Sequence, residues 1–360
     1  MPSQNEWASF VHTQSKQLWV YSFYFSYFYM SIAQKNDPII TFIDFLSIFA
    51  QFCSHYNMFI HSITYRKGKT MNLKTLINTT ALAISANTFA VDLASKNTDS
   101  YQHIRNATGR LNYAGKTFLI DPMLAEKGRY AGFEGTLNSH LRNPLVELPM
   151  KAEDTFKDVD AIILTHTHED HWDEVAQKIL PKSIKIFVQH ERDGDLLKAQ
   201  GFTNITSLSL EKPVEFEGII LNKTGGSHGT TEMYAVPQLA EILDEAMGVT
   251  FQAKDHPTVY LVGDTVWTAE VNKAINRYKP DVMIMNTGDA RTLAFPNDGI
   301  IMGLQDVAHA RQMLPNTKLI TVHMDAVNHM SVYRKNLRQF VKANKLKNVA
   351  IPEDGETVKF

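Results

Sequence analysis

Four side chains that can bind a metal ion lie within a six-residue stretch of this chain. The stretch reads HTHEDH at residues 166–171 and directly follows the apolar run Ala161–Leu164. Such a run predicts a buried strand, and three imidazoles and a carboxylate crowded into a core would compete for too few hydrogen-bond partners. We therefore interpret the four side chains as metal ligands at a strand's end. They are His166, His168, Asp170 and His171.

The spacing of these ligands predicts two adjacent metal positions. In an extended turn His166 and His168 point the same way, whereas Asp170 and His171 face a second point. The chain contains 14 histidines but only one cysteine, Cys53. A single cysteine excludes both an internal disulfide and a cysteine-based zinc site, so histidine and carboxylate side chains must supply the ligands.

From Tyr101 onward, short strand-like runs alternate with segments of helical periodicity. This alternation predicts one α/β domain over residues 101–360, with helices covering the sheets. The expected strands are Thr117–Ile120, Ala161–Leu164, Lys185–Val188, Val259–Val262, Val282–Met285 and Leu319–Val322. The expected helices are Glu174–Leu180, Ala269–Arg277, Asp306–Leu314 and Val332–Leu346.

The N-terminal part of the chain differs from this domain. Residues 1–70 include an aromatic run without charge at 18–33. From Met71 the layout is that of a secretory signal peptide, with a short basic start, an apolar stretch and then small residues. We expect 1–70 to be an upstream mistranslated extension, 71–100 to be a signal peptide and spacer, and the protein to be periplasmic or secreted. The alternative is a genuine membrane-associated segment at 1–70 and a cytoplasmic or membrane-associated protein.

The HTHEDH stretch resembles the HxHxDH signature of the metallo-β-lactamase superfamily. Later segments resemble further motifs of that superfamily in the required order, and the resemblance covers residues 103–360. It implies a four-layer αββα sandwich. The ligand pattern is similar to that of the ascorbate-6-phosphate lactonase-like branch, which also includes the phospholipase D that hydrolyses N-acylphosphatidylethanolamine. The matching segments are FLIDP at 118–122, GGSHG at 225–229, YLVGDT at 260–265 and TVHMD at 321–325.

Carried over position by position, the resemblance implies a complete binuclear site. One metal would be held by three histidines and the other by two histidines and an aspartate, with a second aspartate bridging them. The first set is His166, His168 and His228, the second is Asp170, His171 and His323, and the bridge is Asp264.

Three of these residues also have simpler interpretations when each is taken alone. His228 could be a loop histidine, His323 a core histidine, and Asp264 the cap of the helix that begins near Ala269. Their positions after predicted strands, in the order of the family, favour the metal interpretation. Asp121 would lie behind the ligands and orient a histidine ring, or would simply form a turn before a proline.

Two divalent ions a few ångströms apart would bridge a water, lower its pKa and stabilise the oxyanion formed when the hydroxide attacks. The sequence thus predicts a metallo-hydrolase that cleaves a small ester, lactone or similar bond, with Asp170 orienting the nucleophile and shuttling its proton. Zinc is the expected metal, and manganese(II) or iron(II) would suit the same ligands. The alternatives are a phosphodiesterase or phospholipase D-like lipid hydrolase, and a redox or non-catalytic metal-binding member.

The expected partner is a small-molecule substrate. A formal charge of −2 gives no reason to expect nucleic acid, and membrane association is expected only if residues 1–70 are genuine. The long loop Leu124–Pro149 is expected to form one wall of the substrate site, with Tyr130 and Arg142 as candidate contacts. Asn286 marks a second wall. His329 is a candidate substrate contact or proton donor, with an ordinary loop histidine as the alternative.

Overall fold

The computed structural model describes residues 62–65, 69–72 and 98–360. The chain divides into two units, Met1–Phe89 and Ala90–Phe360. In the first unit the described residues form an antiparallel hairpin of β1 (Ser62–Tyr65) and β2 (Lys69–Asn72). The predicted signal peptide, apart from its first two residues, and most of the predicted extension lie outside the described residues. No helix in the described part of the chain is long and apolar enough to cross a membrane.

The second unit is built on two seven-stranded mixed sheets. In the first sheet, the strands on one side of β5 run antiparallel, and β5 to β8 run parallel to one another. The strand order across this sheet is β16 (Thr357–Lys359), β3 (Ser100–Arg105), β4 (Thr108–Tyr113), β5 (Lys116–Ile120), β6 (Ala161–Leu164), β7 (Lys185–Val188) and β8 (Ile205–Ser207).

The second sheet repeats this plan. Its β9 to β12 pair antiparallel, and β12 to β15 run parallel. Its order is β15 (Val349–Ala350), β14 (Lys318–Val322), β13 (Val282–Asn286), β12 (Val259–Leu261), β11 (Gly248–Gln252), β10 (Ile219–Thr224) and β9 (Val214–Phe216). Parallel neighbours place their carboxyl ends at one edge of each sheet, which is where the functional residues follow.

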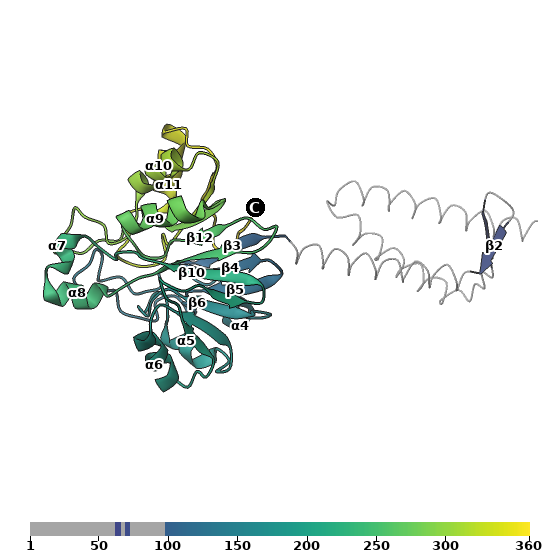
Figure 1. The fold of residues 1–360 in the computed structure, drawn as a ribbon, viewed down its shortest axis with the longest axis horizontal. Helices are drawn as coiled ribbons and strands as arrows, with labels where there is room; N and C mark the ends of the chain where they lie inside the picture. The colour runs from purple at the N-terminus through teal and green to yellow at the C-terminus, as the bar shows by residue number, and fades with distance from the viewer. Residues whose placement is uncertain (1–61, 66–68, 73–97) are drawn as a thin grey trace, which may run out of the picture. The chain divides into compact units, whose positions relative to one another are not determined.

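Helices cover the outer face of each sheet, as Figure 1 shows, with α9 to α11 on one side of the paired sheets and α4 to α6 on the other. The four-layer αββα arrangement expected from the sequence is therefore confirmed, and every predicted strand and helix is present with small changes at its ends. The helices are α4 (Ala152–Thr155), α5 (Glu174–Ile179), α6 (Glu191–Ala199), α7 (Thr231–Tyr234), α8 (Pro237–Leu243), α9 (Ala269–Tyr278), α10 (Leu304–Met313) and α11 (Arg334–Ala343).

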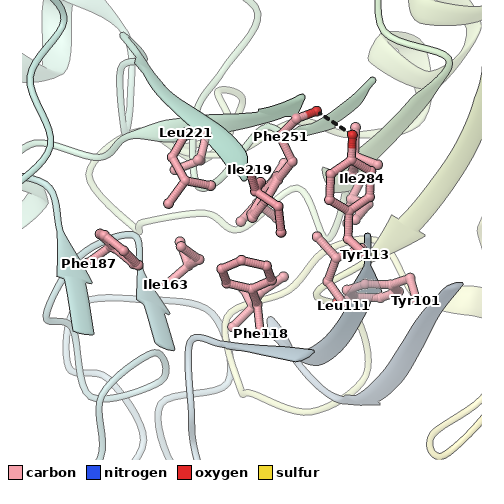
Figure 2. Close-up of a cluster of buried hydrophobic side chains, with 14 of the residues drawn as sticks. Tyr101, Leu111, Tyr113, Phe118, Ile163, Phe187, Ile219, Leu221, Phe251 and Ile284 are labelled. Carbon is pink, nitrogen blue, oxygen red and sulfur yellow. Dashed lines mark hydrogen bonds between the residues drawn. The ribbon is translucent and has the colours of Figure 1, made fainter. Parts of the chain in front are cut away.

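The main core lies between the two sheets. Phe118 on β5 contacts Phe251 on β11 edge-on, with ring centroids 5.2 Å apart, and contacts Phe216 on β9 at 5.8 Å. Figure 2 shows Phe118 and Phe251 in this core, and the hydrogen bond from the Tyr113 hydroxyl to the carbonyl oxygen of Phe251. Alternate residues of a strand point to opposite faces, so Ile163 faces this core while its neighbour Ile162 packs against the outer helices.

Candidate metal centre

The HTHEDH segment leaves the first sheet at the end of β6. All four residues of β6 are buried, as a central parallel strand with both faces covered requires. The chain then turns back, and the backbone carbonyl of His168 accepts hydrogen bonds from the N–H groups of His171 (2.9 Å) and Trp172 (2.8 Å). Asp173 ends the turn by capping α5, its side chain accepting a hydrogen bond from the N–H of Ala176. This tight turn brings four potential ligands to one sheet edge.

The other predicted ligands reach the same place from the second sheet. Each follows a strand of that sheet: His228 comes after β10, Asp264 after β12 and His323 after β14. The cap of α9 is Thr268, so capping does not account for Asp264. All seven predicted ligands thus form one cluster, and within each of three groups the potential ligand atoms lie within 4.8 Å of one another. The groups are His166, His168 and His228; His166, His171 and Asp264; and Asp170, His171 and His323.

One carboxylate oxygen of Asp264 lies between the two predicted metal positions. Its Oδ2 is 3.5 Å from Nε2 of His228, which belongs to the first position. The same oxygen is 3.1 Å from Nε2 of His171 and 3.4 Å from Nε2 of His323, which belong to the second. Asp170 is the third member of the second position, and its Oδ2 lies 3.3 Å from Nε2 of His323.

Hydrogen bonds at the outer ring nitrogens leave the inner nitrogens free for a metal ion. Nδ1 of His166 lies 3.1 Å from Oγ1 of Thr165, and its Nε2 is buried without a partner among the described residues. Nδ1 of His228 lies 3.1 Å from the carbonyl oxygen of Ile300, which also leaves Nε2 inward. His168 is reversed: its Nε2 is 2.9 Å from the carbonyl oxygen of Ile242, so Nδ1 is the nitrogen left for a metal.

This donor set fits divalent transition ions. The Nε2 atoms of His171 and His323 face each other at 3.0 Å with two carboxylates beside them, a grouping that a shared cation stabilises. Imidazole and carboxylate together suit zinc, iron and manganese. The His166, His168 and His228 group would hold one ion, the Asp170, His171 and His323 group a second, and Asp264 could bind both.

The electrostatics of the second group favour positive charge. Burial by itself would raise the pKa of the Asp264 carboxyl, but the facing His323 and His171 rings outweigh burial and hold that pKa well below its usual value. The pKa of Asp170 is held low against burial by the same two rings. Burial lowers the pKa of His323, yet the two carboxylates overcome it and raise it to about 9. Carboxylates that hold protons on these rings would equally stabilise a metal cation.

The first group has the opposite character. Burial is the largest effect on both His166 and His228, and it lowers the pKa of His166 well below the usual value and that of His228 to about 4. Both rings are therefore neutral at pH 7, and the neutral ring with an unprotonated inner nitrogen is the form that binds metal.

Asp121 lies behind the cluster and orients His171, the role that the sequence predicted for it. Its Oδ2 is 2.9 Å from Nδ1 of His171, and its two oxygens also accept hydrogen bonds from the backbone and hydroxyl of Thr165 at 2.7 and 2.8 Å. Asp121 and His323 both adopt left-handed backbone, with φ of 42° and 62°. Such conformations cost on the order of 1–3 kcal/mol and cluster at functional sites.

Two asparagines support the cluster from behind. Nδ2 of Asn286, at the end of β13, donates to Oδ1 of Asp264 at 2.5 Å, and Asn286 is 2% exposed. Asn286 is thus engaged with a predicted ligand, not displayed at a substrate wall. Asn106 in the turn between β3 and β4 donates to the backbone carbonyl of Asp170 at 3.0 Å. Sequence analysis missed Asn106, because an asparagine between two strands also suits a plain turn.

The Leu124–Pro149 loop is held in place by its own contacts. Arg142 is exposed, and its guanidinium donates to the carbonyl oxygens of Gly128 and Arg129, both at 2.8 Å, so it closes the loop on itself. Tyr130 pairs with Asn143 through its backbone. Phe133 reaches His329, with the rings edge-to-face and their centroids 4.9 Å apart. His329 also lies beside the predicted ligands, since the charges of Asp170 and His323 act on its ring.

Known proteins are similar to this chain in fold and in sequence. A family model described as "Beta-lactamase superfamily domain" matches residues 116–324. The UPF0173 protein YddR of Bacillus subtilis (strain 168) is 42% identical over 258 residues, covering 71% of this chain and 98% of that protein. The crystal structure of a possible metal-dependent hydrolase from Veillonella parvula DSM 2008 is 52% identical, with a TM-score of 0.71, covering 73% of this chain and 100% of that one.

A second solved structure is the isothiocyanate hydrolase from Delia radicum gut bacteria. It is 44% identical with a TM-score of 0.70, and the match covers 72% of this chain and 99% of that one. Three findings agree on the family of this chain. They are the family match, the 42% identity to a UPF0173 protein across nearly its whole length, and the two similar structures. It belongs to the metallo-β-lactamase superfamily and, within it, to the UPF0173 family.

Proposed function

We propose that this chain is a hydrolase that requires two divalent metal ions, with zinc as the first candidate, and that it acts on the electrophilic carbon of a small molecule. The observation that carries the proposal is the position of Asp264, whose Oδ2 lies 3.5 Å from a ring of the first ligand group and 3.1 Å from a ring of the second. A carboxylate oxygen shared in this way suits a centre of two ions.

Bound ions would lower the pKa of a water toward neutrality and stabilise the negative charge that develops on the substrate. The protein contributes the orientation of the ligands and the movement of protons. Asp170 is 4% exposed, and its pKa is held low, so its side chain is an ionised carboxylate at neutral pH. It would take the proton of the attacking water and deliver it to the leaving atom.

We propose isothiocyanates as the first substrate class, because the Delia radicum gut enzyme, at 44% identity over 72% of this chain, is an isothiocyanate hydrolase. Water would add across the C=N bond of R–N=C=S, with its oxygen on carbon and a proton on nitrogen. Cleavage of the C–N bond would then release the amine R–NH₂ and carbonyl sulfide, which balances one water against one isothiocyanate. The ester or lactone predicted from the sequence needs the same attack on an electrophilic carbon, and it is the second candidate.

Turnover with and without metal tests this proposal. The full chain would be assayed against isothiocyanates, simple esters, lactones and a phosphodiester, as purified, after chelation, and after zinc or manganese is returned. We expect isothiocyanate loss with equimolar amine, abolished by chelation and restored by metal. Full activity after chelation would contradict the metal requirement. Metal-dependent turnover of esters or lactones alone would show that these, and not isothiocyanates, are the substrate class. Turnover of the phosphodiester alone would favour a phospholipase-like function.

Metal content gives a separate check on the site. We expect two ions per chain in the wild type, and Asp264→Ala and His168→Ala should lower that number and abolish turnover while the domain stays folded by circular dichroism. Full activity in both variants would rule out the proposed centre.

A further inference from the structure

His329 is a buried histidine beside the metal cluster that is not one of its predicted ligands. It is 7% exposed, and its Nδ1 has no hydrogen-bond partner among the described residues. Burial lowers the pKa of this ring to about 4, so the ring is neutral at pH 7 and carries one N–H donor. The other charges that act on the ring belong to the cluster, and they include those of Asp170, His323, Asp264 and His168.

An unpartnered buried nitrogen is costly, and folded proteins keep few of them. The ring of His329 is nevertheless held in a definite orientation. Phe133 contacts it edge-to-face, with centroids 4.9 Å apart and planes at 86°. A polar group that is fixed in place, buried and without a partner next to a reactive centre is suited to bind an incoming ligand.

Asn328, the preceding residue, ties the Leu124–Pro149 loop to this histidine. Asn328 is 1% exposed, and it exchanges hydrogen bonds with Asn143 in both directions, each at 2.9 Å. Its amide also donates to Oγ1 of Thr136 at 2.9 Å, and its side-chain oxygen accepts from the backbone N–H of Phe133 at 3.0 Å. These hydrogen bonds join Asn328 to the loop that carries Phe133. Because Asn328 directly precedes His329, they also hold Phe133 and His329 in place relative to each other.

The surroundings of Phe133 are apolar. Phe133 packs against a cluster of buried side chains, here called the apolar cluster. The segments that form it also provide the carbonyl oxygen of Ile300 to His228, so it adjoins the metal cluster. The charge of Arg291, on one of these segments, is balanced by an ion pair with Asp289, in which Nη2 lies 2.6 Å from Oδ2. The buried members of the apolar cluster are Met123, Met233, Leu243, Ala290, Ile300, Ile301, Val327 and Met330.

We propose that His329 donates a hydrogen bond to the reacting group of an uncharged substrate, and that the apolar part of that substrate lies against Phe133 and the apolar cluster. The inference rests on the proposed function, because it places the substrate of that same site. When a nucleophile adds to the carbon of N=C=S or of a carbonyl, negative charge develops on the neighbouring nitrogen, sulfur or oxygen. A fixed N–H donor in a water-poor setting stabilises such charge more in the transition state than in the free substrate.

Steady-state kinetics with benzyl isothiocyanate test the role of His329. His329→Leu should lower kcat/KM about 10²- to 10³-fold, the usual effect of removing one such donor, while two metal ions per chain are retained. His329→Gln keeps an N–H donor and should recover about tenfold or more of that loss. The matched control is His309→Leu on α10, whose ring makes a similar edge-to-face contact with Trp267 at 4.5 Å and should leave kcat/KM unchanged.

The role of Phe133 is tested by comparing two substrates. Phe133→Ala should raise KM for benzyl isothiocyanate several-fold more than KM for methyl isothiocyanate, with kcat changed less than KM. An equal effect on both substrates would overturn the apolar placement. For His329, either a kcat/KM within threefold of wild type, or a loss of activity that parallels a loss of bound metal, would overturn the assignment.

Binding of thiocyanate separates this inference from the proposed function. The ion carries the same N, C and S atoms, and its affinity for the cobalt(II)-substituted protein can be read from the visible spectrum without turnover. If wild type hydrolyses nothing in the panel, the proposed function fails, and this titration alone decides the role of His329. Affinity at least tenfold weaker in His329→Leu, at equal cobalt content, supports a ligand contact; equal affinity overturns it.

Discussion

The side-chain amide of Asn106 donates a hydrogen bond to the backbone carbonyl oxygen of Asp170, at 3.0 Å. The backbone carbonyl of the same asparagine accepts from the N–H of His323, at 2.9 Å. Asp170 follows the first sheet and His323 follows the second, and both are predicted ligands of one metal position. One turn residue therefore sets the distance between ligands that come from different sheets.

Replacing Asn106 with glycine should weaken metal binding at this position. Asn106 has φ of 59°, which glycine adopts without strain, so Asn106→Gly removes the amide and keeps the turn. We expect a loss of about 10- to 100-fold in affinity for one of the two ions, the usual range for groups that orient ligands. Chelator competition with metal analysis measures it. Asn112→Ala on the same hairpin, which bonds to Ser100 instead, is the control, and equal metal affinity in both variants would contradict the role of Asn106.

Asp121 should matter for a different reason, because it fixes which nitrogen of His171 faces the metal. Asp121→Asn can present an N–H where the carboxylate oxygen now lies 2.9 Å from Nδ1 of His171. We expect a loss of about 10- to 100-fold in metal affinity or turnover. Asp160→Asn, at the opposite end of β6 where Asp160 accepts from the N–H of Thr117, provides the comparison. A wild-type metal content and rate in Asp121→Asn would rule out the orienting role.

Most of the fold could be predicted because the central strands are short, continuous and apolar. β6 and β13 are buried along their whole length, so any sequence that forms them must look apolar throughout. Strands such as β10, which reads IILNKT and mixes buried with exposed positions, carry no such local signal. β10 pairs with β9 across a tight turn and with β11 further along the chain, and none of these three strands was predicted.

The ligands of the HTHEDH segment could be named because they lie together directly after an apolar strand, whereas His228, Asp264 and His323 were implied by the resemblance to the superfamily. The residues that support them are not visible in the same way. Asn286 was predicted to line the substrate site, yet its amide turns inward to Asp264. Asn328 gave no signal at all, because its partners lie on a loop about 190 residues earlier. Contacts of this kind arise only when the two sheets close on each other.

Metal binding should depend on pH through His171 and His323. In the metal-free protein the carboxylates outweigh burial, raising the pKa of His171 well above its usual value and that of His323 to about 9. These rings therefore keep protons at pH 7.5 that a metal ion must displace, and affinity should rise as pH increases toward 9. We expect zinc addition at pH 7.5, in weak buffer with an indicator dye, to release protons. Zinc binding without proton release would show that the rings are already neutral.

Metal binding and the packing between the two sheets should each stabilise the folded domain, since the predicted ligands come from both sheets. Phe118 is fully buried and contacts Phe251 and Phe216 across the interface between the sheets. Phe118→Ala should lower the free energy of unfolding of the metal-free protein by about 3–5 kcal/mol, because it leaves a cavity at the centre of that interface.

Added metal should raise the melting temperature of Phe118→Ala as well as that of wild type, because ions that bind only the folded protein stabilise it by mass action. Leu196→Ala, at a position 44% exposed on α6, should change the unfolding free energy little and is the control. Chemical denaturation followed by circular dichroism, with and without zinc, measures both effects. If Phe118→Ala lost stability but zinc no longer raised its melting temperature, the ligands would depend on this one contact for their alignment. If zinc raised the melting temperature of both proteins similarly, the cluster would form independently of the packing at Phe118, as the hydrogen bonds through Asn106 and Asp121 lead us to expect.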